Sequence, residues 1–277
     1  MRSPTVSSVR LPGDRRLTVR GWEGTGDPLV LLHGLLDCSE GWVSLAERTE
    51  RPCVAIDLPG FGGSDLPRKP RIASYAEDVA EALGRLGVDR CTLVGHSLGG
   101  AVAATVAQQA PSVSSLILLA PAGFGRIALA EALTKPLVVD VATLALPLAL
   151  VNPLTVTAAY STFVARRRLS ERELIARLRR RAVRAPQAVR AATVAIAAAG
   201  RDERRRIDFA GPVAALWGAN DALVPTAHAR GVRESLPQAH VEFWPEMGHH
   251  PQRERPRALA HFVERHSAPP QPLRAVA

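Results

Sequence analysis

The sequence predicts an α/β protein built on a mostly parallel, doubly wound sheet with an inserted helical segment. Short runs that are apolar on both faces, as in central parallel strands, alternate along the chain with segments of helical spacing. From about residue 123 to residue 206 the alternation stops, and only apolar and arginine-rich segments with helical spacing follow. A chain of 277 residues is long enough for one large domain that carries such an insertion.

The expected elements follow in chain order. Residues Leu17 to Trp22 alternate in the way of a half-buried antiparallel strand. Apolar runs predict buried strands at 29–32, 53–56, 91–94, 116–119 and 213–217, and a further strand near a sheet edge at 241–244. Helical patterns cover 75–86, 100–109, 227–236 and 257–265. We therefore expect a core domain formed by residues 1–122 and 207–266, a helical cap at 123–206 and a flexible tail at 267–277.

The insertion also carries the charge of the protein. It holds 16 basic and 6 acidic residues, a surplus of +10, so the 19 basic and 20 acidic residues elsewhere leave −1 of the net charge of +9. Its arginine clusters at 166–168 and 177–184 lack interleaved aromatic residues, and arginine replaces lysine almost throughout the chain. This favours solvated helix faces in a protein from a GC-rich genome over a nucleic-acid site. Attraction of an anionic substrate or of a membrane surface stays open.

Composition indicates an ordinary soluble globular protein, with 47% hydrophobic and 22% charged residues. The apolar stretch at 136–159 is interrupted by Asp140 and by prolines before it reaches the roughly 20 residues of a membrane span, which predicts cap helices and no stable membrane insertion. Three cysteines, Cys38, Cys53 and Cys91, are an odd number without metal-ligand spacing. We therefore expect buried free thiols and no metal. Because the N-terminal region contains no signal-peptide core, we also expect a cytoplasmic location.

The most informative motif is Gly95-His96-Ser97-Leu98-Gly99, which directly follows an apolar strand. A serine between a strand and a helix must adopt a strained turn, and glycines on either side leave room for it, so that the hydroxyl stands exposed. The motif predicts a serine nucleophile. Such a serine needs a base, a carboxylate that orients the base, and donors for the oxyanion.

The partners of a serine nucleophile are expected at the carboxyl ends of other strands. Asp221 follows the strand at 213–217, and His249 follows the last strand. The chain order of serine, aspartate and histidine is the one expected of this class of strand-turn-helix nucleophile. Asp57 and Asp65 flank a Pro-Gly-rich turn, where aspartates most often bind nearby backbone N–H groups. They are not predicted to be catalytic.

Four motifs together make the chain resemble the α/β-hydrolase fold proteins that carry an inserted cap. They are His33-Gly34-Leu35-Leu36 after a buried strand, the turn Asp57 to Ser64, the serine motif, and the paired Asp221 and Gly248-His249 loops. The resemblance runs from the first strands to Phe262. It implies that the backbone N–H groups of Leu35 and Leu98 form the oxyanion hole. It also implies that His249 is the base and that the adjacent His250 is a pocket wall or a partly exposed neighbour.

Neighbouring residues receive structural roles. His33 and His96 are expected to bind loop backbone, supporting the motifs together with Gly34, Gly95 and Gly99. Some members of the family place the carboxylate after the strand that precedes the cap, but residues 121–124 contain no acid. Asp221 is therefore the only well-placed candidate.

The predicted function is hydrolysis of a carboxylic ester or thioester, with an apolar acyl compound as the small-molecule substrate and no cofactor. The same triad also serves carbon–carbon bond hydrolases, cofactor-free haloperoxidases or perhydrolases, and acyltransferases of this fold. Epoxide hydrolases and dehalogenases use an aspartate in place of Ser97. A non-catalytic binding module with a basic cap is a further alternative. The sequence leaves the substrate, the oligomeric state and opening of the cap undetermined.

Overall fold

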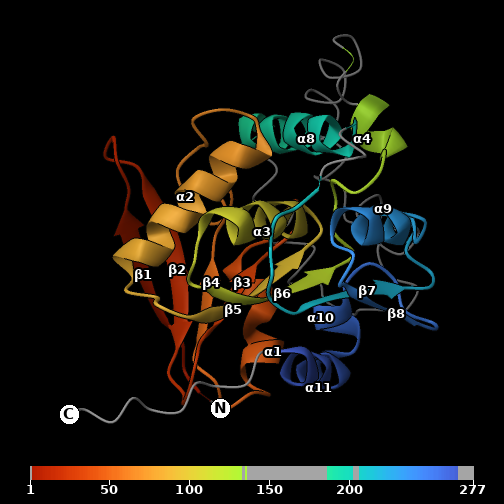
Figure 1. The fold of residues 1–277 in the computed structure, drawn as a ribbon. Coiled ribbons are helices and arrows are strands. Elements are labelled where there is room, and N and C mark those ends of the chain that lie inside the picture. The colour runs from red at the N-terminus through yellow and green to blue at the C-terminus, as the bar shows by residue number, and fades with distance from the viewer. Residues whose placement is uncertain (1, 133–134, 136–185, 202–205, 268–277) are drawn as a thin grey trace, which may run out of the picture.

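The computed structural model describes residues 2–132, 135, 186–201 and 206–267. Its centre is an eight-stranded sheet with the strand order β1-β2-β4-β3-β5-β6-β7-β8 (Figure 1). The strands are β1 (Thr5–Arg10), β2 (Arg16–Trp22), β3 (Leu29–Leu32), β4 (Cys53–Ile56), β5 (Cys91–His96), β6 (Val113–Leu119), β7 (Val213–Gly218) and β8 (His240–Trp244). β1 and β2 are antiparallel to their neighbours, and the strands from β4 to β8 pair in parallel. This confirms the predicted α/β class.

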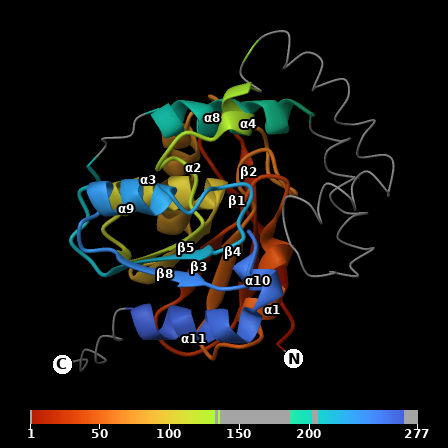
Figure 2. The ribbon, with the colours of Figure 1, turned by 90° about the vertical axis from the view of Figure 1, so that its right-hand side faces the viewer.

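Helices cover both faces of the sheet (Figures 1 and 2). The described helices are η1 (Ser39–Trp42), α1 (Val43–Ala46), α2 (Ile72–Arg85), α3 (Leu98–Gln109), α4 (Ala128–Ala132), α8 (Pro186–Arg201), α9 (His228–Ser235), α10 (Pro251–Glu254) and α11 (Pro256–His266). One apolar core joins the sheet to α2, α3, α8 and α9, and a second joins its opposite face to α1 and α11.

The two cores explain why the central strands are apolar at every position. Along β3, Val30 and Leu32 belong to the first core, whereas Leu29 and Leu31 belong to the second. Side chains of a strand alternate between the two faces of the sheet, and here both faces are covered. All four residues are fully buried.

Within residues 123–206, the described part of the chain contains the two helices α4 and α8. α8 contacts both α2 and α3, and it also contacts α4. In Figure 2 it lies across the top of the layer formed by α2 and α3. The apolar stretch 136–159, the arginine clusters 166–168 and 177–184, and the tail beyond Ser267 lie outside the described residues. The division into core, cap and tail therefore stays a prediction.

Some elements differ from expectation. β1 was not predicted, because five of its six residues are exposed and its sequence lacks an apolar alternation. It pairs with β2 at the edge of the sheet, where backbone hydrogen bonds hold it. Cys38, Cys53 and Cys91 are buried, as expected. In the part of the chain that the structure describes, no helix is both long and apolar enough to cross a bilayer.

Candidate active site

The predicted catalytic residues lie at the carboxyl ends of the parallel strands. Ser97 follows β5, Asp221 follows β7 and His249 follows β8. These strands run parallel, so their carboxyl ends meet at the same edge. The loop after β3, which contains Leu35, joins them there.

Ser97 occupies the strained turn that its motif predicts. Its backbone lies at φ 53° and ψ −116°, a conformation that residues with a Cβ rarely adopt. The Ser97 N–H donates to the carbonyl of Leu119 on β6 at 2.9 Å. The Ser97 carbonyl accepts from Ala122 at 3.0 Å and from Gly100 at 2.9 Å. Neighbouring elements therefore hold the serine in this conformation.

The glycines around Ser97 are required by close approach. A Cβ on Gly95 would lie 2.3 Å from the carbonyl oxygen of Gly99, and one on Gly99 would lie 2.3 Å from that of Leu32. A Cβ on Gly34 would lie 2.9 Å from His96 Nδ1 and 3.1 Å from Ser97 Cβ. The loop after β3 thus packs directly against the serine turn.

Asp221 and His249 form a hydrogen-bonded pair. His249 Nδ1 lies 2.7 Å from Asp221 Oδ2, and both side chains are buried. The other carboxylate oxygen of Asp221 accepts from the backbone N–H groups of Leu223 at 2.9 Å and Val224 at 3.0 Å. Burial alone would raise the pKa of Asp221, but His249 and the two N–H donors outweigh it and lower that pKa. The ionised carboxylate accepts the Nδ1 proton, which leaves Nε2 of neutral His249 as an acceptor.

His96 is held as a neutral ring. Its Nε2 lies 2.8 Å from the carbonyl oxygen of His249, and its Nδ1 lies 3.3 Å from the side-chain amide of Gln252. The Nε2–H tautomer satisfies both contacts, donating to the carbonyl and accepting from the amide. Burial, reinforced by the neighbouring His249, lowers the pKa of His96 to about 3. As predicted, this histidine binds loop backbone.

The other structural assignments also agree with the geometry. His33 Nδ1 contacts the carbonyl of Gly34 at 2.7 Å, and the N–H of Leu58 donates to His33 Nε2 at 2.9 Å. Asp57 accepts from the backbone of Ser39 at 2.6 Å and from that of Gly63 at 2.9 Å. Asp65 accepts from the backbone of Arg16 at 2.8 Å.

His250 lies against both neighbouring histidines. Its ring centroid is 4.7 Å from that of His96 and 5.2 Å from that of His249. Burial, together with its neighbours His96, His249 and Arg253, lowers the pKa of His250 well below its ordinary value. The residue as a whole is half-buried. Its role as a pocket wall stays a prediction.

The amides expected to form the oxyanion hole are placed by two neighbouring turns. Leu98 is the first residue of α3, so its N–H is among those that have no acceptor within the helix. Leu35 precedes Leu36, whose φ of 59° turns the chain after β3. Because Gly34 packs against Ser97, this turn lies beside the serine.

The sequence interpretation missed an ion pair that joins two of these loops. Arg253 Nη2 donates to Asp37 Oδ1 at 2.7 Å, with only 9% and 6% of the two side chains exposed. Burial opposes ionisation of Asp37, but Arg253 and His33 outweigh it and lower its pKa. Asp37 belongs to the loop after β3, and Arg253 follows His249 by four residues. Nothing in the local spacing of either residue indicates the pairing.

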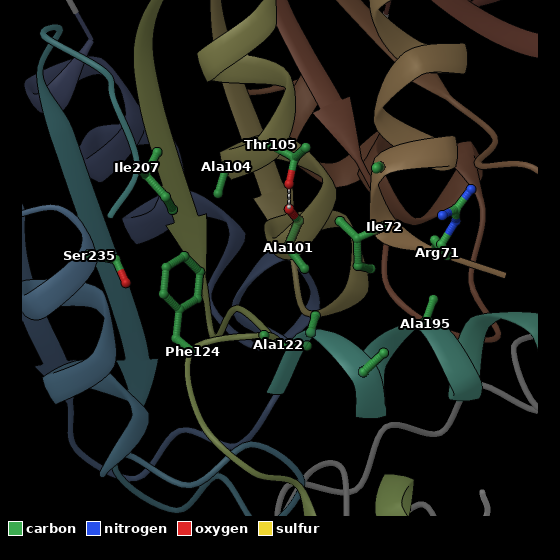
Figure 3. Close-up of a pocket in the computed structure, with 14 residues that line it drawn as sticks. Arg71, Ile72, Ala101, Ala104, Thr105, Ala122, Phe124, Ala195, Ile207 and Ser235 are labelled. Carbon is green, nitrogen blue, oxygen red and sulfur yellow. Dashed lines mark hydrogen bonds between the residues drawn. The ribbon is translucent and has the colours of Figure 1, made fainter. Parts of the chain in front are cut away.

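A cavity of about 200 Å³ lies between α2, α3 and α8 (Figure 3). Figure 3 shows Ala101 and Ala104 of α3 on one side and Ala195 of α8 on another. Two of its lining residues, Ala101 and Ala122, donate backbone hydrogen bonds to the Ser97 carbonyl at 3.3 and 3.0 Å. The cavity is therefore adjacent to the serine turn, and its lining is mainly aliphatic, with Phe124 at one end.

Comparison with known proteins decides the family. A family model described as the alpha/beta hydrolase fold matches residues 27–256. The chain belongs to this family. As a hydrolase of the α/β-hydrolase family, it acts on a small-molecule substrate.

Three further similarities bear on this hydrolase. A Mycobacterium tuberculosis protein whose name assigns it no function is 30% identical over 288 residues, covering 94% of this chain and 82% of the relative. An sn-1-specific diacylglycerol lipase of Danio rerio is 36% identical over 114 residues, covering 38% of this chain and 35% of the lipase. The crystal structure of a bacterial membrane phospholipase A has a TM-score of 0.74 and 27% identity, covering 95% of this chain and 85% of the phospholipase.

Proposed function

We propose that this α/β hydrolase cleaves a carboxylic ester or thioester through a triad of Ser97, His249 and Asp221. The observation that carries the proposal is the 2.7 Å contact of His249 Nδ1 with Asp221 Oδ2, at the sheet edge where Ser97 occupies its strained turn. The pair would supply the orienting carboxylate and the base that acyl transfer by a serine nucleophile requires.

In the proposed reaction, His249 Nε2 removes the hydroxyl proton while Ser97 Oγ attacks the acyl carbon. The carbonyl oxygen becomes an oxyanion and accepts hydrogen bonds from the amides of Leu35 and Leu98. The imidazolium then gives its proton to the leaving alcohol or thiol, which leaves an acyl-enzyme. Water then attacks the acyl-enzyme while giving a proton to His249. The imidazolium returns this proton to Ser97 Oγ as the acid leaves, which restores the free serine.

Electrostatics supports each role in this reaction. Asp221 stays ionised and stabilises the imidazolium that forms at His249. His96 stays neutral, so it adds no positive charge that would oppose protonation of His249. An oxyanion-hole donor typically contributes about 3 kcal/mol to lowering the barrier.

The proposed substrate has an apolar acyl group. The aliphatic cavity beside the serine turn suits a hydrocarbon chain, and its volume of about 200 Å³ favours a short or medium chain. The names of two relatives, a diacylglycerol lipase and a phospholipase A, refer to ester hydrolysis of acylated lipids. Both similarities support an oxygen ester as the first substrate to examine.

The proposal is tested with p-nitrophenyl esters from acetate to palmitate. We expect turnover by the native protein and a loss of at least about 10⁴-fold in Ser97→Ala, because the nucleophile is absent. Ser44→Ala is the matched control. Ser44 lies on α1, which packs on the face of the sheet opposite to the face covered by α3. Mass spectrometry of the native protein quenched during turnover is expected to find the acyl group on Ser97. Equal turnover in Ser97→Ala and the native protein would contradict the triad.

A further inference from the structure

Three side chains with metal-binding atoms meet on the outer surface of β8 and α11. His240 and Glu242 are two residues apart on β8, and His266 is the last residue of α11. The candidate ligand atoms all lie within 4.8 Å of one another. His240 is the first residue of β8, at the end opposite to the loop that carries His249. The cluster is therefore separate from the candidate active site.

The spacing of the ligand atoms matches the coordination sphere of a small transition-metal ion. Glu242 Oε1 lies 3.1 Å from His240 Nε2 and 3.5 Å from His266 Nε2. Metal–ligand bonds of about 2.1 Å at tetrahedral angles put neighbouring ligand atoms roughly 3.4 Å apart. Two of the three distances between ligand atoms thus already match. A rotation of the exposed His240 side chain can bring the third distance, between the two histidines, to the same value.

The surroundings orient the ligands. Trp244 Nε1 donates to Glu242 Oε2 at 3.2 Å, which turns the other oxygen, Oε1, toward the histidines. The two imidazole rings stack with centroids 4.7 Å apart and an interplanar angle of 24°, so both Nε2 atoms face the same carboxylate.

Arg265 uses the same carboxylate oxygen. Its Nη2 donates to Glu242 Oε1, and its guanidinium carbon lies 5.9 Å from the centroid of the Phe262 ring. Two functions of the cluster are therefore possible in physical terms. Either Glu242 serves only to neutralise Arg265 and the histidines, or Arg265 moves aside when a cation binds.

We propose that His240, Glu242 and His266 form a binding site for a divalent transition-metal ion of the zinc class, with water as a fourth ligand. Imidazole nitrogens with one carboxylate oxygen suit Zn²⁺ and its neighbours Ni²⁺ and Cu²⁺. The ion would crosslink the edge strand β8 to the terminal helix α11. Because it lies at the opposite end of β8 from His249, it would stabilise the fold and would not take part in ester hydrolysis.

The test uses tag-free, EDTA-treated full-length protein and isothermal titration with ZnCl₂. All eight histidines of the chain lie among the described residues, so each alternative histidine site can be examined in turn. We expect one Zn²⁺ per chain and an affinity reduced about tenfold or more in His240→Ala and in His266→Ala. His261→Ala is the matched control, because His261 is exposed on α11 outside the cluster. Its affinity is expected to equal that of the native protein.

Arg265→Gln separates the two functions of the cluster. If Arg265 competes for Glu242 Oε1, its removal increases the affinity for Zn²⁺ and leaves the stoichiometry unchanged. At a hundredfold excess of Zn²⁺ over the Kd, the native protein is also expected to melt on the order of 5 °C higher, and the double variant His240→Ala/His266→Ala is not. Absence of Zn²⁺ binding, or full binding that persists in the double variant, would overturn the proposal.

Discussion

At the scale of single residues, the candidate site depends on how each ionisable group is kept in one protonation state. Asp221 is ionised, because His249 and two backbone N–H groups lower its pKa against the effect of burial. His96 and His250 are neutral, because burial lowers the pKa of each. His249 is the histidine of this cluster whose ring contacts a carboxylate, that of Asp221.

This arrangement predicts that catalysis depends on the Asp221 carboxylate. In Asp221→Asn the imidazolium that forms at His249 during the reaction loses its carboxylate partner. The rate is expected to fall about 10³- to 10⁴-fold, because the amide does not enforce the correct tautomer. Steady-state measurement of kcat/KM at pH 7 checks this effect.

Asp65→Asn controls for the loss of a carboxylate elsewhere in the protein. Asp65 accepts a backbone hydrogen bond from Arg16 at 2.8 Å, which an asparagine oxygen can also accept. Its kcat/KM is expected to match that of the native protein. An unchanged kcat/KM in Asp221→Asn would show that Asp221 does not act on the base.

At the scale of elements, the short helix α10 joins the separate loops of the site. Three consecutive residues of α10 each contact a different part of it. Gln252 contacts His96, Arg253 binds Asp37 in the loop after β3, and Glu254 accepts from the backbone of Gly248 at 2.9 Å and of His250 at 3.0 Å. The helix therefore fixes the loop of His249 relative to both the serine turn and the expected oxyanion turn.

The buried pair of Asp37 and Arg253 predicts a coupled loss of stability and activity. Arg253→Met leaves the charge of Asp37 buried without its main partner, which is expected to lower the free energy of unfolding by about 3 to 5 kcal/mol. Since the pair lowers the pKa of Asp37, its contribution is present above the ordinary carboxyl pKa of about 3.9. It is lost as the pH falls through the folded pKa. Urea unfolding at pH 7 and at lower pH measures this difference.

A double variant separates stability from positioning. Asp37→Asn combined with Arg253→Met removes both charges, so much of the stability is expected to return. The rate is expected to stay low, because the loop of Leu35 is no longer tied to α10. Arg85→Met is the control, since Arg85 pairs with Glu81 on the surface, and such pairs contribute about 1 kcal/mol or less. Full recovery of kcat in the double variant would show that the pair does not position the loop.

At the scale of the whole molecule, helices α2, α3 and α8 together line the cavity beside the serine turn. Ala198 of α8 lines this cavity, whereas Ala191 of the same helix does not. Ala198→Leu fills part of the space, so the preferred p-nitrophenyl ester is expected to shift by two or more carbons toward shorter chains. Ala191→Leu is expected to keep the native preference. An unchanged optimum in Ala198→Leu would mean that the acyl chain lies elsewhere.

The sequence by itself determined the sheet, the family and the order of the candidate residues. Apolar runs and helical spacing are local patterns. A strand buried on both faces of the sheet has apolar residues at consecutive positions, as in residues 29–32. Glycines that permit close approach and a serine between a strand and a helix are equally local signals. These local signals place Ser97, Asp221 and His249 at strand ends.

Only the tertiary structure decided which distant side chains touch. The pair of Asp37 with Arg253 and the cluster of His240, Glu242 and His266 each join residues from separate elements. The hydrophobic periodicity of the sequence does not indicate such contacts, because they depend on how loops and helices pack after the sheet has formed. The edge strand β1 was missed for a related reason, since its backbone pairs with β2 while its side chains face solvent.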